Sequence, residues 1–241
     1  ELHWGKVESF EKDPSDKNGR YAGGKSLRED LEGGPWDFVT VQQASIKSHD
    51  LATYRPFAQK LVAYIKKHAP GATVLMHETW EYRVDDARFS VKEPKPGEPR
   101  TQNEMHQGLS SAYGTIAQEL GLKIIPVGDA FHLANHDSQM GFHPPASFDS
   151  KKAKPGELPD QTHSLNVGWT WKKQADGSMK LGMDGHHASM AGEYLGACVW
   201  YEVIFGRNVE SNTFVPQGLD ADYAKFLRSV AHRAVQAKQT R

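Results

Sequence analysis

Short apolar runs alternate with longer amphipathic stretches over the first half of this 241-residue chain. The apolar runs cover residues 36–43, 72–79 and 122–127, and their length and β-branched content predict strands. The stretches between them carry apolar residues at helical spacing, which predicts helices over 52–68 and 102–120. Such an alternation is typical of a parallel sheet that is covered by helices on both faces. The sequence therefore predicts an α/β fold.

The first two predicted strands end in polar residues. Gln42 and Gln43 close the first strand, with Ser45 just beyond it, and Thr79 and Trp80 follow the second. Because the carboxyl ends of parallel strands meet at one edge of a sheet, we expect these side chains to line a binding site there. Successive strand residues face opposite ways, so regular geometry aims only one of the two glutamines into the site. The alternative is that one or both glutamines cap neighbouring loops.

A histidine and an aspartate stand close together in the last third of the chain. Asp184 precedes His187 by three residues, and Gly192 follows it by five, where the apolar stretch 194–205 predicts a helix. A carboxylate at this spacing can hold an imidazole in one tautomer, which a hydrolase that activates a serine requires. The alternative is that His187 is a surface histidine beside an aspartate in a turn.

The composition fits one globular domain over residues 1–241, interrupted by a long, proline-rich loop insertion at about 137–167. The net charge of −1 and the absence of like-charge blocks argue against nucleic acid and membrane surfaces as partners. No apolar stretch is long enough to span a membrane. The single cysteine, Cys198, excludes a disulfide framework, and its apolar surroundings predict a small buried side chain.

Local signals predict three further features. Residues 5–24 are polar and glycine-rich and should be irregular. A short helix should follow over 25–32, where Ser26 and Glu29 have the spacing of a capping box. Ala175-Asp176-Gly177 should turn a β-hairpin between two strand-like runs.

Four segments together resemble a known family. They are Trp36–Ser45, Glu78–Tyr82, Ile125–Phe131 and Asp184–His187. In this order they are similar to the SGNH (GDSL-like) hydrolase superfamily, and in particular to a bacterial branch composed mostly of domains of unknown function. The resemblance covers nearly the whole chain. It implies a three-layer α/β/α sandwich with a parallel, flavodoxin-like sheet.

The resemblance also implies a serine esterase or acyl hydrolase, in which His187 is the general base and Asp184 orients its imidazole. The family's nucleophilic serine lies just after its first strand, in a Gly-Asp-Ser or Gly-Asn-Ser context. The resemblance places Glu1 well after that block. We therefore expect the first strand and the serine to lie upstream of Glu1.

The oxyanion asparagine of the family has no counterpart, because Ala44-Ser45-Ile46 occupies its stretch. Gln42 or Gln43 would have to donate in its place. The family implies a small or carbohydrate ester as substrate and no cofactor. An upstream signal peptide would accompany a secreted or periplasmic location, and the oligomeric state stays open.

Two other functions compete with the esterase. The first is a non-catalytic carbohydrate-binding or scaffold protein that keeps the fold. The missing serine block favours it, and Trp169 and Trp171 could stack on sugar rings or pack in the hairpin.

The second alternative is a metal-dependent hydrolase. His132 and His136 have the spacing that puts two imidazoles on one face of a helix. Leu133 stands where a zinc peptidase of this spacing would have its glutamate. The third ligand would then be Asp137 or His143. Our principal expectation is a site without a metal.

Overall fold

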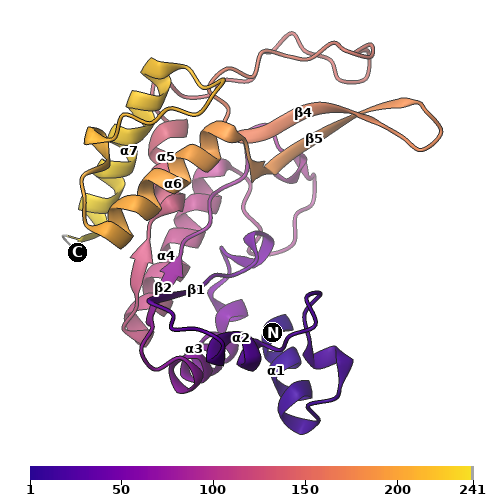
Figure 1. The fold of residues 1–241 in the computed structure, drawn as a ribbon. Coiled ribbons are helices and arrows are strands. Elements are labelled where there is room, and N and C mark those ends of the chain that lie inside the picture. Colours follow the sequence, from indigo (N-terminus) through magenta and orange to yellow (C-terminus); the bar gives the residue numbers. More distant parts are fainter. Residues whose placement is uncertain (240–241) are drawn as a thin grey trace.

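The computed structural model describes residues 1–239. Its β-strands in this range form one parallel sheet and one antiparallel hairpin (Figure 1). The strands of the sheet, in spatial order, are β1 (Phe38–Val41), β2 (Thr73–His77) and β3 (Lys123–Ile125). Both pairs are parallel, with Val39 beside Val74 and Leu75 beside Lys123. The predicted α/β class is confirmed.

Helices make up most of the remaining regular structure. The α-helices in this part of the chain are α1 (Leu2–Lys12), α2 (Leu27–Glu32), α3 (Phe57–His68), α4 (Gln102–Leu120), α5 (Val127–Asn135), α6 (Met190–Phe205) and α7 (Ala221–Gln239). Short 3₁₀ turns cover Lys17–Gly19, Ser45–Lys47, Leu51–Tyr54, Ala87–Ser90 and Val209–Ser211. Over residues 1–239, none of the helices combines the length and apolar character needed to cross a membrane.

The side chains of β2 alternate between two layers of helices. Val74 and Met76 point to the face that is covered by α3 and α4. Leu75 points to the other face and packs with Ile125 in the core built from α5, α6 and α7. This alternation follows from the two-residue period of a strand. The result is the predicted three-layer arrangement, with the sheet in the middle.

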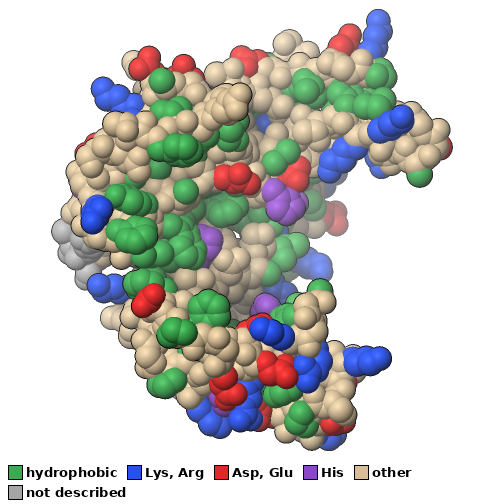
Figure 2. All heavy atoms as spheres, in the orientation of Figure 1, with side chains coloured by type: hydrophobic (Ala, Val, Ile, Leu, Met, Phe, Trp, Pro, Cys, Tyr) green, Lys and Arg blue, Asp and Glu red, His purple; other side chains and the backbone are tan. Residues whose placement is uncertain are grey.

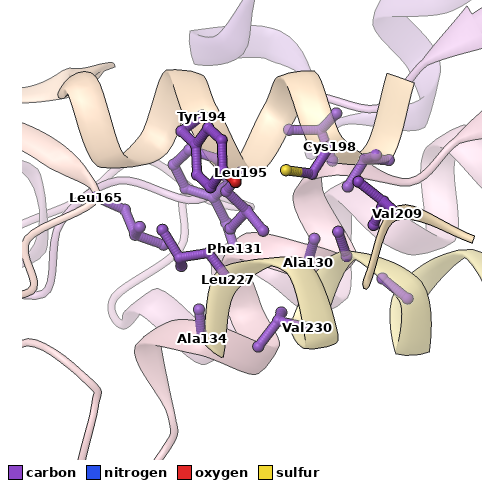
Figure 3. Close-up of a cluster of buried hydrophobic side chains, with 14 of the residues drawn as sticks. Ala130, Phe131, Ala134, Leu165, Tyr194, Leu195, Cys198, Val209, Leu227 and Val230 are labelled. Carbon is purple, nitrogen blue, oxygen red and sulfur yellow. The ribbon is translucent and has the colours of Figure 1, made fainter. Parts of the chain in front are cut away.

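The larger core lies between α5, α6 and α7 (Figure 3). Phe131, Leu195 and Leu227 contribute one side chain from each helix, and all three are fully buried. Cys198 lies in the same core and is buried, as predicted. Burial raises the pKa of its thiol to about 11, so the thiolate needed for reactivity is disfavoured.

Helix α4 has the bounds that its sequence predicts, because both ends carry strong local signals. The Thr101 hydroxyl accepts a hydrogen bond from the backbone N–H of Glu104 at 3.1 Å, and Gly121 adopts the left-handed conformation that ends the helix. The helix predicted over 52–68 is instead split, with α3 beginning after Pro56. Proline lacks the N–H that a continuous helix would use.

In the N-terminal region, helix α1 differs from the sequence prediction, whereas the start of α2 agrees with it. The sequence predicts irregular structure over residues 5–24. This is wrong for the first part, because α1 extends to Lys12 and buries Val7 and Phe10. The capping box at the start of α2 is present. The Ser26 hydroxyl accepts from the N–H of Glu29 at 3.2 Å, and the Glu29 carboxylate accepts from the N–H of Ser26 at 2.8 Å.

Strand β1 differs from the buried strand that its apolar sequence predicts. It forms an edge of the sheet, since it pairs with β2 on one side and with no other strand of residues 1–239. Phe38 on its outer face remains 38% exposed, and Trp36 before it is 49% exposed. Figure 2 shows that the molecule is deeply hollowed between the β4–β5 side and the α1–α3 side.

Helix α5 is absent from the sequence prediction, in which the third strand continues to residue 127. The strand ends earlier, at Ile125, and Gly128 lies in the first turn of the helix. A Cβ atom at Gly128 would stand 2.2 Å from the carbonyl oxygen of Thr79. The glycine is therefore there for close approach of the helix to the chain after β2, and it does not end the strand.

The hairpin predicted around Asp176-Gly177 is present and projects from the body of the molecule (Figure 1). Its strands are β4 (Asn166–Lys173) and β5 (Met179–Ala188). Residues 137–165, which precede the hairpin, contain no helix or strand.

Because β5 is longer than its sequence suggested, Asp184 and His187 lie on a strand and not in a loop. Helix α6 also begins earlier than expected, at Met190 instead of near Gly192. Ser189 caps it by accepting a hydrogen bond from the N–H of Gly192.

The close packing at Gly128 makes a testable prediction. Gly128→Ala should lower the free energy of unfolding by about 1–3 kcal/mol, because a backbone carbonyl blocks the added methyl group. Gly114→Ala is the matched control, since nothing lies within 4 Å of its added Cβ in the middle of α4. That variant should gain up to about 1 kcal/mol from helix propensity. Denaturant unfolding of both variants checks the prediction, and equal effects would contradict it.

Candidate active site

Asp184 and His187 form a hydrogen-bonded pair on β5. The Nδ1 atom of His187 lies 2.9 Å from Oδ2 and 3.1 Å from Oδ1 of Asp184. Oδ1 also accepts the backbone N–H groups of His187 at 3.0 Å and His186 at 3.2 Å. Partial burial acts to raise the pKa of the Asp184 carboxyl, but these N–H donors outweigh it and lower that pKa below its usual value. The carboxylate is thus ionised and fixed in direction.

The orientation of His187 follows from its partner. A carboxylate only accepts hydrogen bonds, so Nδ1 carries the proton and Nε2 keeps its lone pair. The His187 side chain is 81% exposed, whereas that of Asp184 is 25% exposed. The largely covered Asp184 carboxylate therefore holds the His187 ring in an orientation in which Nε2 faces solvent.

The pair borders a shallow groove of about 430 Å³ along the hairpin. The residues that line the groove are Thr170, Lys172, Gln174, Lys180, Gly182, Met183, Asp184, His186 and His187. Two lysines, a threonine and a glutamine make it polar. It suits a polar or anionic small molecule better than an apolar one.

His186, which also lines the groove, connects the pair to the segment after β2. Its Nε2 lies 3.1 Å from Oδ2 of buried Asp86, and its ring stacks on that of Tyr82 at 4.0 Å between centroids. The Tyr82 hydroxyl lies 3.1 Å from the hydroxyl of Ser45. Ser45, beyond the end of β1, is thereby linked to the segment that carries His187. Sequence reasoning gave no role to Tyr82 or Asp86, and no spacing motif marks them.

Thr79 and Trp80 hold neighbouring parts of the structure in place. The indole N–H of Trp80 donates to the carbonyl oxygen of His186 at 2.9 Å, and its ring stacks on Phe131 at 4.7 Å. Thr79 is buried, and its hydroxyl lies 3.2 Å from that of Tyr113. Trp80 therefore positions β5, and Thr79 lies inside the fold and not on the groove.

The two glutamines that follow β1 have different partners. The Gln43 amide donates to the carbonyl and the hydroxyl of Thr53 and accepts from the N–H of Ala44, so it fixes a loop. Within residues 1–239, the Gln42 side chain has a single hydrogen-bond partner, since its Oε1 lies 2.6 Å from Nδ1 of His77. Its amide N–H₂ is therefore the one that stays available for a ligand.

A cluster of charged side chains, distinct from the Asp184–His187 pair, lies at the start of α5. Lys238 of α7 reaches Asp129 at 2.8 Å and fully buried Glu78 at 3.5 Å. Burial and the charge of Asp129 raise the pKa of Glu78 to about 7. Next to this cluster, Glu81, His132 and His136 bring ligand atoms within 4.8 Å of one another.

The third member of this set corrects the sequence expectation. Asp137 was a candidate ligand, but its Oδ1 accepts the N–H groups of Gln139 and Met140 in its own turn. His143 lies exposed in the following loop. Glu81, which sequence reasoning did not single out, joins the two histidines instead.

No protein-family model and no curated protein matches this sequence. Among solved structures, a DUF4886 family protein from Bacteroides uniformis is similar, with a TM-score of 0.64 and 25% identity over 88% of this chain and 67% of that one. This match confirms the resemblance to a branch of domains of unknown function. A "putative SGNH hydrolase" from Slackia heliotrinireducens aligns with a TM-score of 0.46 and 20% identity, over 82% of this chain and 77% of that one.

His77 makes stability depend on pH. Burial lowers the pKa of His77 to about 4, so folding keeps it neutral while the unfolded chain takes up a proton below about pH 6.5. The unfolded state then binds more protons, and stability falls as the pH drops from 6.5 to 4. His77→Gln, which keeps an amide donor for Gln42, should reduce this loss by up to about 3 kcal/mol.

Denaturant unfolding at pH 7 and pH 4 measures the difference. His143→Gln changes an exposed histidine, so it should lose as much stability between pH 7 and pH 4 as the unsubstituted protein does. Equal losses in the His77 and His143 variants would contradict the assignment.

Proposed function

We propose that this chain carries the base of a serine-type ester hydrolase, with His187 as general base and Asp184 as its orienting group. One observation carries the proposal: an ionised carboxylate with fixed geometry holds Nδ1 of an imidazole whose Nε2 faces solvent. This is the arrangement that a hydroxyl nucleophile needs in order to lose its proton as it attacks.

The chemistry follows from the two nitrogen atoms. Nε2 of His187 takes the proton of the serine hydroxyl while the serine oxygen bonds to the acyl carbon of the ester. The tetrahedral intermediate then expels the alcohol, which receives that proton from Nε2. A water molecule repeats the sequence on the acyl-enzyme and releases the acid. Asp184 stabilises the imidazolium in both halves and does not itself become protonated.

The nucleophile belongs to a part of the site outside residues 1–239. Over this range no hydroxyl group hydrogen-bonds to Nε2 of His187, and the Ser45 hydroxyl is bonded to Tyr82. Strand β1 has an unpaired edge, and its carboxyl end leads to Ser45. We propose that a strand from a segment preceding Glu1 pairs there and delivers the serine.

For the oxyanion we propose the Gln42 amide, since within residues 1–239 its N–H₂ group has no hydrogen-bond partner while that of Gln43 is engaged. A donor of this kind contributes about 3–4 kcal/mol to the transition state in a serine protease. The polar groove with Lys172 and Lys180 supports a small, hydrophilic ester, such as an acylated carbohydrate.

The first test is loss of the base. In the full-length gene product, His187→Ala should abolish labelling by a fluorophosphonate probe and lower ester hydrolysis by about 10³-fold or more. His143→Ala, which removes an exposed histidine from the loop, should leave both unchanged. Undiminished labelling of the His187 variant would rule out its role as base.

The second test concerns the tautomer. Asp184→Asn keeps the acceptor for the two backbone N–H groups but offers an N–H₂ where Nδ1–H needs an acceptor. We expect the imidazole to move its proton to Nε2 and kcat to fall about 10²–10⁴-fold. Nitrogen NMR of His187 reports the tautomer directly. An unchanged tautomer together with full activity would show that Asp184 does not orient the base.

A further inference from the structure

Three potential metal ligands lie close together where α5 packs against the segment that follows β2. Glu81, His132 and His136 each supply one potential ligand atom, and these three atoms lie within 4.8 Å of one another. None of them has a part in the proposed ester hydrolysis. A ligand bound by these three side chains would therefore be independent of that function.

Glu81 is buried without the partners that a carboxylate needs. Its side chain has no exposed surface. Oε1 accepts one hydrogen bond, from the amide of Asn135 at 3.0 Å, whereas Oε2 has no hydrogen-bond partner. An unpaired, buried carboxylate oxygen is costly, and such groups are normally paired with a cation or bound to a metal.

His132 faces this carboxylate without forming a hydrogen bond to it. Its Nδ1 lies 3.6 Å from Oε1 of Glu81 and has no hydrogen-bond partner. The ring is held in place by His106, which stacks parallel to it at 3.8 Å between centroids. A separation near 3.6 Å is close to the edge of a tetrahedron with metal–ligand bonds of about 2.0–2.1 Å.

His136 completes the set one helical turn later. Its Nδ1 lies 3.0 Å from the carbonyl oxygen of His132, which can only accept, so Nδ1 carries the proton. Nε2 is then left with its lone pair. Histidine ligands commonly donate the opposite ring N–H to a backbone carbonyl in this way, which fixes both the tautomer and the ring orientation.

We propose that Glu81, His132 and His136 bind a divalent transition-metal ion, with Zn²⁺ as the best match. Two imidazole nitrogens and one carboxylate oxygen form a three-ligand zinc set that leaves a fourth position open to water. Mg²⁺ and Ca²⁺ fit poorly, because they select sites made of oxygen ligands. An ion pair between Glu81 and a protonated His132 would still leave Oε2 of Glu81 unpartnered.

Titration of the untagged, chelator-stripped full chain with Zn²⁺ tests the site, with a chromophoric chelator as competitor. We expect one ion per chain. His136→Ala removes an exposed ligand at the end of α5, so the fold should survive. Glu81→Gln keeps the shape of the side chain and an oxygen for Asn135. Each should weaken binding by at least about tenfold, the lower bound for loss of even an outer-shell partner.

His143→Ala is the matched control and should bind Zn²⁺ as the original protein does. Co²⁺ in place of Zn²⁺ should show the visible absorption of a four- or five-coordinate ion, and this spectrum should be lost in His136→Ala. Absence of saturable binding would overturn the proposal. It would be overturned equally if His136→Ala bound the metal like His143→Ala, whether or not the Glu81 variant folds.

Discussion

The buried guanidinium of Arg83 fixes the hairpin, and with it His187, against the sheet. The side chain is 2% exposed and pairs with both carboxylate oxygens of Asp85, while Nη1 reaches the Gln161 amide oxygen at 2.7 Å. Its backbone N–H donates to Gly185, one residue from the Asp184 carboxylate. Gly168 makes room for it, since a Cβ there would stand 2.0 Å from Nη1. A buried charge is stable only with its polar partners in place, so Arg83 has a fixed position. Its backbone hydrogen bond to Gly185 then fixes the position of β5.

Histidine–carboxylate pairs are common in this fold, and pairing alone does not identify a base. Within residues 1–239, six histidines lie within 4 Å of a carboxylate oxygen; they are His68, His106, His132, His186, His187 and His232. In the other five, less than half of the histidine side chain is exposed. His187 differs because its side chain is 81% exposed while its carboxylate is mostly covered. Its accessibility, and not the pair itself, suits it to proton transfer.

Prediction from sequence succeeded where the signal was local. Helix α4 carries its own cap and its own stop, so its bounds needed no knowledge of the rest of the chain. It failed where a distant contact decides the structure. Gly128 lies in the first turn of α5, where the carbonyl oxygen of Thr79, from another segment, leaves no room for a Cβ atom. Likewise, the i, i+4 spacing indicated His132 and His136, but only the fold could bring Glu81 to them. The pairing of Asp184 with His187 could be predicted because the two residues are only three positions apart.

The edge of β1 also has a consequence for how the chain behaves in solution. A strand with free N–H and C=O groups along one side is a template for any extended segment that meets it. Phe38 and Trp36 beside that edge add apolar surface to the same place. Copies that lack a strand at this position would therefore tend to associate as concentration rises, by adding strands to one another's sheets.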